Sequence, residues 1–298
     1  MIEGVIVHTL VSGGVFAILA IGFSLIFGVA RVLNMAHTAF FALAAFGMFY
    51  LLSPVAGVEL AVAPAIIIVV IIVGVLGMLA YKLFINPVRE HPAAVLLITI
   101  ALAMIVEEVL VWRFGGQNRT IRFLVPGTVD IFGITIANQN LLTLGVVAVT
   151  IVAVWLILSK TKLGIAIRAV ANDTEIAGLM GISASRVLMI TMGIASALAA
   201  IAGVVMAPLT TIAPNMWAPP LTTTMVVVII GGLGSIKGSI IGAFILGLVS
   251  ALSVVDPLAL LRGGGGYLNI TFTLAAMVIV LIVRPSGLFG TLFEEEKL

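Results

Sequence analysis

The chain has 298 residues, of which 62% are hydrophobic and only 9% are charged, and its net charge is +2. A water-soluble domain of this size could not hide so much apolar surface from solvent, so the composition excludes a soluble protein. The absence of cysteine excludes disulfides, thiolate metal sites and cysteine nucleophiles.

Continuous apolar runs recur along the whole chain. A bilayer core about 30 Å thick is crossed by about 20 apolar helical residues, whereas a transmembrane β-barrel shows alternating segments of about 10 residues. The runs here are continuous, so we expect an all-α polytopic membrane protein that forms one transmembrane domain over residues 1–298. The sequence predicts eight or nine transmembrane or half-membrane helices, near 4–30, 36–52, 60–81, 93–112, 141–159, 187–209, 220–236, 240–255 and 266–283.

Short segments leave two points of this prediction open. The run 36–52 is short, and the runs 220–236 and 240–255 meet at a Gly/Ser/Lys junction, so the latter two could be half-helices. The first run has the position of a signal peptide, but it is too long and carries Glu3 where a signal peptide has Lys or Arg. We therefore expect a retained helix there.

The distribution of Lys and Arg predicts the orientation. If all nine segments cross, ten basic residues share one side and four lie opposite. Because cytoplasmic loops carry the Lys/Arg excess, we expect the loops 82–92 and 160–186 and the C-terminus in the cytoplasm, and the loop 113–140 outside. The ten are Arg31, Lys82, Arg89, Lys160, Lys162, Arg168, Arg186, Lys237, Arg284 and Lys297, and the four are Arg113, Arg119, Arg122 and Arg262.

The two longest loops differ in character. The external loop 113–140 mixes β-branched residues with turn signals, which predicts a short hairpin or lid over the external mouth. The loop 160–186 interleaves apolar residues with charged ones, which predicts one or two short helices lying at the cytoplasmic surface.

A weak internal repeat places small residues four apart in both halves. In the first half the series is Ala30, Asn34, Thr38 and Ala42, and in the second it is Gly234, Gly238 and Gly242, accompanied by Ser235 and Ser239. Small residues at this spacing let helices approach closely in lipid, and interrupted segments in corresponding halves are typical of transporter substrate sites. We expect Gly234, Gly238 and Gly242 to form a packing surface, and Asn34, His37, Thr38, Ser235 and Ser239 to lie along a substrate pathway. Asn34 and His37 could instead cap or break a helix near the cytoplasmic interface, beside Arg31, without meeting substrate.

Other chemistry finds little support in the sequence. The run GGLGSIKGS lacks the spacing of a phosphate-binding loop, so the chain is not expected to bind ATP, and no protease motif or metal site is predicted. We predict neither an enzyme nor a nucleic-acid partner.

Glu107 and Glu108 lie at the end of the span 93–112, beside Arg113. We expect them to form a charged cluster at the membrane interface, with the acids directed outward. The alternative is that they are proton-coupling carboxylates.

Four stretches resemble permeases of the high-affinity branched-chain amino-acid ABC importer family. They are GFSLIFGVARVLNMAH, RAVANDTEIAGLMGISASRV, IIGGLGSIKGSIIGA and VRPSGLFG, in the order and spacing of that family, and the resemblance covers nearly the whole chain. It implies an inner-membrane permease of a prokaryote, with a second homologous permease subunit, two ATP-binding subunits and an extracytoplasmic substrate-binding protein as partners. ATP would be bound by the partner subunits and no cofactor by this chain.

The resemblance also implies a role for the loop 160–186, which in such permeases seats in a groove of the ATP-binding subunit. The matching positions in this sequence are Arg168, Asp173, Glu175, Ala177 and Gly181. The implied substrates are Leu, Ile and Val, with other amino acids or small amides such as urea carried by relatives. The alternative from another class is a proton-coupled secondary transporter, which would depend on Glu107 or Glu108.

Overall fold

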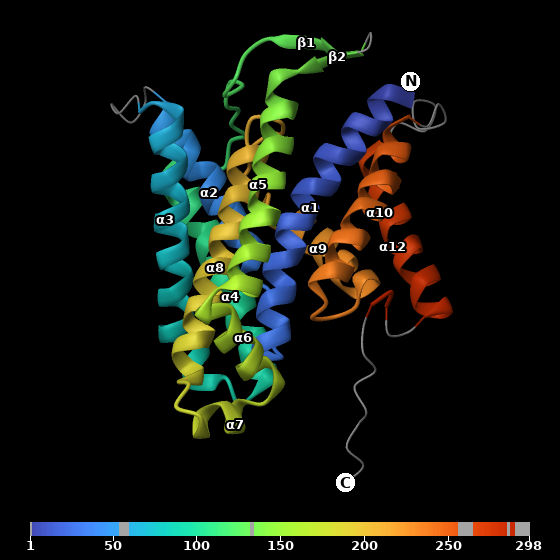
Figure 1. Cartoon of the computed structure of the whole chain (residues 1–298). Helices are drawn as coiled ribbons and strands as arrows, with labels where there is room; N and C mark the ends of the chain where they lie inside the picture. Colours follow the sequence, from blue (N-terminus) through green and yellow to red (C-terminus); the bar gives the residue numbers. More distant parts are fainter. Residues whose placement is uncertain (1, 54–59, 132–133, 256–264, 285–286, 290–298) are drawn as a thin grey trace.

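The structure is a computed structural model, and it describes residues 2–53, 60–131, 134–255, 265–284 and 287–289 (Figure 1). Its elements are α1 (Ile2–Ala30), α2 (His37–Leu52), α3 (Val62–Ala80), a π-helical turn (Tyr81–Ile85), a 3-10 turn (Asn86–Val88), α4 (Pro92–Phe114), β1 (Thr128–Ile131), β2 (Ile134–Ala137), α5 (Asn138–Lys160), α6 (Lys162–Asn172), α7 (Thr174–Leu179), α8 (Ala184–Met206), α9 (Ala218–Gly231), α10 (Ile236–Val255) and α12 (Gly265–Val283).

The predicted all-α polytopic fold is confirmed. Five helices are long and apolar enough to cross a membrane, namely Gly4–Ala30, Val62–Val88, Pro92–Phe114, Asn138–Lys160 and Ala184–Met206. Shorter apolar helices follow at His37–Leu52, Ala218–Gly231, Ile236–Leu252 and Thr273–Val283. Each of the nine predicted segments therefore contains a helix, and most boundaries agree within three residues because continuous apolar runs mark the spans directly.

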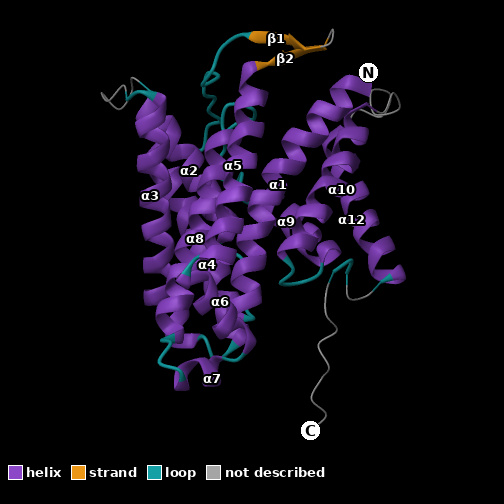
Figure 2. Cartoon of the chain, viewed as in Figure 1, coloured by secondary structure: helices purple, strands orange, loops and turns teal. Residues whose placement is uncertain are grey.

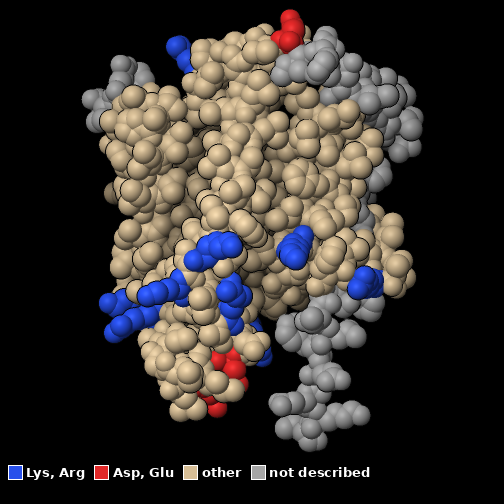
Figure 3. Space-filling model, viewed as in Figure 1, with Lys and Arg blue, Asp and Glu red and all other residues tan. Residues whose placement is uncertain are grey.

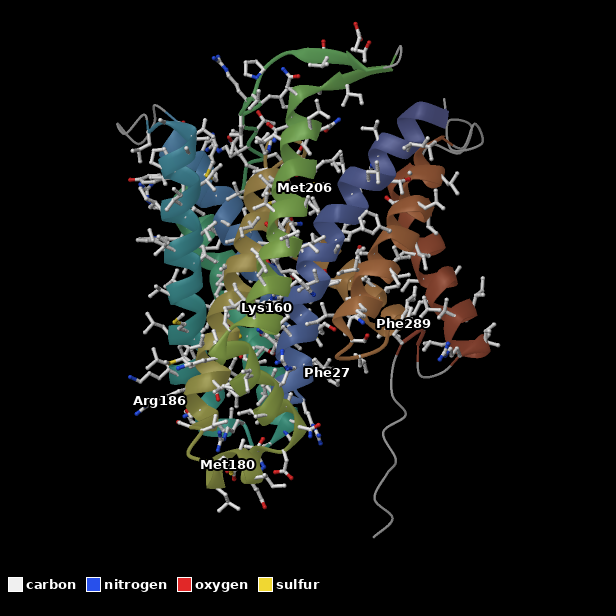
Figure 4. All side chains as sticks on the ribbon, viewed as in Figure 1. Phe27, Lys160, Met180, Arg186, Met206 and Phe289 are labelled. Carbon is white, nitrogen blue, oxygen red and sulfur yellow. The ribbon has the colours of Figure 1, made fainter. Side chains whose placement is uncertain are left out.

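The molecule exposes large apolar side chains around its sides. Ile71 on α3, Leu97 on α4 and Val149 on α5 are 59%, 67% and 70% exposed. Such exposure is rare on a soluble protein but expected of a surface that contacts lipid. Figure 3 shows Lys and Arg gathered over the lower part of the view, where Figure 4 labels Lys160 and Arg186.

The interior, in contrast, is built from small residues that bring helix backbones together. α1 runs through the middle of the bundle and contacts α5, α8, α9 and α10. Where α1 crosses α10, a Cβ added to Gly247 would lie 2.7 Å from the Cα of Gly13, so only glycine fits. A Cβ on Gly77 of α3 would likewise overlap Ser196 of α8. Close backbone contact of this kind is a main source of helix association in lipid.

The segment 113–140 forms the predicted hairpin. β1 and β2 pair antiparallel, with Thr128 opposite Ala137 and Ile131 opposite Ile134, and lie above the helices in Figure 2. The chain before β1 returns into the bundle, where Arg119 forms an isolated antiparallel bridge with Ile212 of the α8–α9 connection. The α4–β1 and α8–α9 connections are thus joined to each other.

Both predicted stripes of small residues are wrong as continuous helical faces. Ala30 ends α1 and Asn34 lies in the connection to α2, so only Thr38 and Ala42 share a helix. Gly234 lies between α9 and α10, because Gly232 and Gly234 adopt φ values of +100° and +81° that no α-helix contains. The expected span 220–236 therefore ends at Gly231.

Candidate functional site

The connection between α1 and α2 is a buried helix break stabilised by polar side chains. Asn34 is 1% exposed, and its Oδ1 accepts a hydrogen bond of 3.1 Å from the amide of Ala36. Its Nδ2 donates to the sulfur of Met192 on α8 at 3.4 Å. The amide of Met35 donates to Thr99 Oγ1 on α4 at 3.2 Å. The break is therefore anchored to two other helices.

His37 and Thr38 begin α2 and are fully buried. The Nε2 atom of His37 lies 3.0 Å from the carbonyl oxygen of Leu19, in the middle of α1. Gly22 makes room for the imidazole, since a Cβ there would lie 2.7 Å from His37 Cε1. In this conformation His37 connects two helices of one chain. Asn34 borders a cavity of about 10 Å³, which is the size of a single water site.

The connection between α9 and α10 faces a larger and more polar cavity. Ser235 accepts a hydrogen bond of 3.1 Å from the amide of Gly238 and so caps α10. It lines a cavity of about 370 Å³ together with Arg31 at the end of α1, Ala171 on α6 and Phe289. Figure 4 shows Phe27, which also lines it, and Phe289 on the two sides of this region. Ser239 is buried instead, with its hydroxyl 2.9 Å from that of Ser24 on α1.

The segment 160–186 forms the two short helices expected of it, and they project from the lower end of the bundle (Figure 1). The guanidinium of Arg168 donates to the carbonyl of Leu158, which fastens α6 to the end of α5. The Oδ1 atom of Asp173 accepts from the amides of Glu175 and Ile176 at 2.8 and 2.9 Å and caps α7. These side chains shape the projection itself.

The other three residues of this segment that were predicted to take part in coupling differ in their burial and backbone conformation. Ala177 is buried, so its small size serves packing inside the chain. Gly181 is exposed and ends α7 with φ +82°, a conformation that favours glycine. The Glu175 side chain is exposed.

The tip of the projection carries exposed apolar side chains. Ile176, Leu179 and Met180 are 60%, 87% and 78% exposed. They follow the capping aspartate at the end of the molecule where Lys and Arg gather, as the position of Met180 in Figure 4 shows. A signal was present in the sequence, since GLMG puts two large apolar residues between glycines in a loop. An exposed apolar tip of this kind is typical of a surface that binds another protein or lies against a membrane.

Comparison with known proteins identifies the family. The family model described as the permease component of the branched-chain amino acid transport system matches residues 5–283. The chain belongs to this family. The family predicted from the four sequence stretches is thus confirmed.

Individual relatives of this permease match over nearly its full length. The high-affinity branched-chain amino acid transport system permease protein LivH of Salmonella typhimurium is 26% identical over 294 residues, covering 93% of this chain and 92% of the relative. BraD of Pseudomonas aeruginosa is 24% identical, covering 96% and 94%. Among solved structures, PsaBC from Streptococcus pneumoniae in complex with Fab matches with a TM-score of 0.51 and 14% identity, covering 94% and 91%. This last likeness concerns the fold alone.

Two glycines of the permease lie where α10 crosses α9. A Cβ on Gly238 would overlap the carbonyl of Gly231, and one on Gly242 would lie 2.8 Å from the carbonyl oxygen of Val227. Gly234 approaches a different helix, with its Cβ position 3.3 Å from Gly28 Cα on α1. The glycines therefore serve two contacts and not one stripe.

The two acids on α4 differ from the outward cluster expected of them. Glu107 is half-buried, and its Oε2 accepts a hydrogen bond of 2.7 Å from the indole Nε1 of Trp217. The expectation that it points outward is wrong, because the α8–α9 connection supplies a donor that the sequence could not place. Glu108 is exposed. Arg113 lies over the rings of Tyr50 and Phe114, at 5.2 and 5.5 Å from their centroids.

Proposed function

We propose that this permease is the membrane subunit of an ATP-driven importer for branched-chain amino acids. It would pair with a second homologous permease subunit, with two ATP-binding subunits on the cytoplasmic side, and with an extracytoplasmic substrate-binding protein. The observation that carries the proposal is the α6–α7 projection with its exposed apolar tip, in a chain that belongs to this permease family.

The packing of α6 supports a coupling role for this projection. α6 contacts α1, α5 and α8, and Gly164 brings its first turn so close to Leu158 that no side chain would fit between them. A partner that held Leu179 and Met180 would therefore displace these three helices together with α6. Only a partner that binds two conformations with different affinity can drive such a change, which is what an ATP-binding subunit in alternating nucleotide states would supply.

Within this proposal the residues predicted to couple the permease to its ATP-binding subunit all take part in coupling, but in different ways. Arg168, Asp173 and Gly181 hold the shape of the projection, Glu175 presents a charge beside the tip, and Ala177 packs beneath it. Ile176, Leu179 and Met180 would make the main contacts. Burial of such apolar side chains in a partner groove is the usual source of affinity at an interface.

The substrate-pathway assignment also becomes more specific. Ser235 lines the 370 Å³ cavity at the end where basic residues gather, and we propose that this cavity lies at the inner mouth. Asn34, His37 and Ser239 bond neighbouring helices to one another, Thr38 is buried at the start of α2, and all four would meet substrate only after those helices move. The orientation follows from the Lys and Arg excess, which puts the α6–α7 end in the cytoplasm of a prokaryotic cell.

Uptake in membrane vesicles tests the proposal directly. Vesicles containing the complete transporter, with its binding protein supplied on the periplasmic side, should accumulate radiolabelled leucine, isoleucine or valine only when ATP reaches the ATP-binding subunits. Collapse of the proton gradient at constant ATP should leave uptake unchanged. Uptake of urea or acetamide, without uptake of these amino acids, would show that the substrates are small amides. Uptake driven by the proton gradient without ATP would refute the proposal of an ATP-driven importer.

A further inference from the structure

Two neighbouring acids on α4 have different surroundings. Glu107 points into the bundle, where its carboxylate accepts the hydrogen bond from Trp217. Glu108 lies on the exposed face of the same helix. None of the hydrogen bonds or ion pairs among the described residues uses its carboxylate. Glu107 is thus occupied by the fold, whereas Glu108 is available to a ligand.

Glu108 lies in a shallow hollow along the outer face of α4, which we call the α4 hollow. It has a volume of about 450 Å³ and is lined by Met104, Ile105, Glu108, Val109 and Trp112. The spacing of these residues puts all five on one face of the helix. The indole of Trp112 is 85% exposed, and Met104 and Ile105 are each more than half exposed.

A lipid-facing position would suit Glu108 poorly. It lies six residues before Phe114 at the end of α4, about 9 Å along the axis from that end at the rise of an α-helix. Long Lys and Arg side chains can reach headgroups from such depth, but a glutamate is shorter. Ionisable side chains within membrane-spanning segments usually face a water-filled path or a protein partner. The hollow is therefore expected to face such a path.

The side chains of the α4 hollow match the chemistry of an aliphatic amino acid. A carboxylate accepts charge-assisted hydrogen bonds from an ammonium group, and the face of an indole ring attracts the same cation. Met104, Ile105 and Val109 offer an apolar surface on either side of the acid. A ligand with a free ammonium group beside a branched aliphatic side chain would satisfy both parts at once.

We propose that the α4 hollow is a transient binding site for the permeating amino acid, in which Glu108 binds the α-ammonium group. Trp112 would lie against that cation, and the three apolar residues would contact the aliphatic side chain. The inference rests on the proposed function. Because the hollow is open on one side, its opposite wall would come from the second permease subunit. A one-sided, shallow site suits a path on which the substrate must bind and then leave.

Substitutions of Glu108 test this site in vesicles that contain the complete transporter. Glu108→Leu and Glu108→Gln should lower leucine uptake at least tenfold, while Glu108→Asp should retain a larger part of it. The melting temperature of the complex should stay unchanged in all three. A glutamate that faces lipid would give the opposite pattern, because leucine is favoured there and uptake would remain at the wild-type rate.

Cysteine labelling gives an independent measurement, since the chain has no native cysteine. Glu108→Cys should react with a membrane-impermeant thiol reagent from outside, and saturating leucine delivered by the binding protein should slow the reaction. The control is Val149→Cys on α5, which is 70% exposed and should not react.

Failure of the α4 site and failure of the proposed function would give different results. An unreactive Glu108→Cys, wild-type uptake by Glu108→Leu, or a lowered melting temperature in that variant would overturn the α4 site. Failure of the wild-type transporter to import leucine would instead refute the proposed function.

Discussion

The two ends of the molecule are built in opposite ways. At the end that carries the hairpin, loops are bonded to one another. Arg119 and Ile212 exchange two backbone hydrogen bonds of 2.8 Å, and Gln139 Oε1 accepts one of 3.0 Å from the amide of Leu124. At the other end, α6 and α7 leave Leu179 and Met180 almost fully exposed.

The contacts at the hairpin end bear on the stability of the chain, whereas the exposed tip at the α6–α7 end bears on its association with other proteins. A loop that satisfies its own backbone groups needs no partner, because its polar groups are already paired. An exposed apolar tip gains free energy only when another surface covers it. The hairpin end is thus held together by contacts within the chain, whereas the α6–α7 end presents apolar side chains that no contact within the described part of the chain covers.

The largest expected effect on stability is at the hairpin end. The Arg119 guanidinium donates to the carbonyl of Phe114 at 3.1 Å and lies over the ring of Phe49 at 5.7 Å. Arg119→Ala removes both contacts and should lower the free energy of unfolding by about 2 kcal/mol, from the usual magnitudes of a charged hydrogen bond and a cation–π contact. Thermal unfolding of the purified protein in detergent measures this. Arg122→Ala, an exposed change in the same loop, is the control and should alter stability by less than about 0.5 kcal/mol.

A smaller and local effect is expected at the α6–α7 end. Asp173→Ala removes the cap of α7 and should cost about 1 kcal/mol of local stability. Amide hydrogen exchange over residues 174–180 should accelerate about fivefold, while exchange in α8 stays the same. Glu175→Ala is the matched control, because its side chain is exposed and caps nothing. Equal exchange in the two variants would show that the projection does not depend on this cap.

The smallest expected effect comes from single cysteines that report which side of the membrane each end of the molecule faces. Single cysteines at Asn118 and Asn172, both exposed, should leave transport unaffected. An impermeant thiol reagent should label Asn118→Cys from outside intact cells and Asn172→Cys only after the cells are opened. Labelling in the reverse order would invert the orientation and remove the cytoplasmic assignment of the α6–α7 end.

Much of this architecture could be predicted from the sequence, because the membrane imposes long apolar runs and turn signals mark the loops. The helix at Ala184–Met206, the hairpin at 128–137 and the two short helices at 162–179 all agree with the predictions. Single-residue surroundings could not be predicted in the same way. Glu107 and Glu108 are adjacent and chemically identical, and their different faces of α4 and the donor on Trp217 distinguish them. Gly234, likewise, fits a helical repeat by spacing but adopts a turn conformation.

The most direct test measures coupling between the α6–α7 tip and the ATP-binding subunit. We expect the double substitution Leu179→Lys and Met180→Lys to prevent co-purification of the ATP-binding subunit and to abolish ATP-dependent leucine uptake. The melting temperature of the isolated permease should remain at its wild-type value, because both side chains contact solvent in the free chain. Ser183→Lys adds one positive charge, half of that added by the double substitution, at an exposed position at the foot of α8 and should transport normally. Full uptake by the double variant, with the ATP-binding subunit still attached, would contradict the central claim that the α6–α7 tip couples this permease to its energy source.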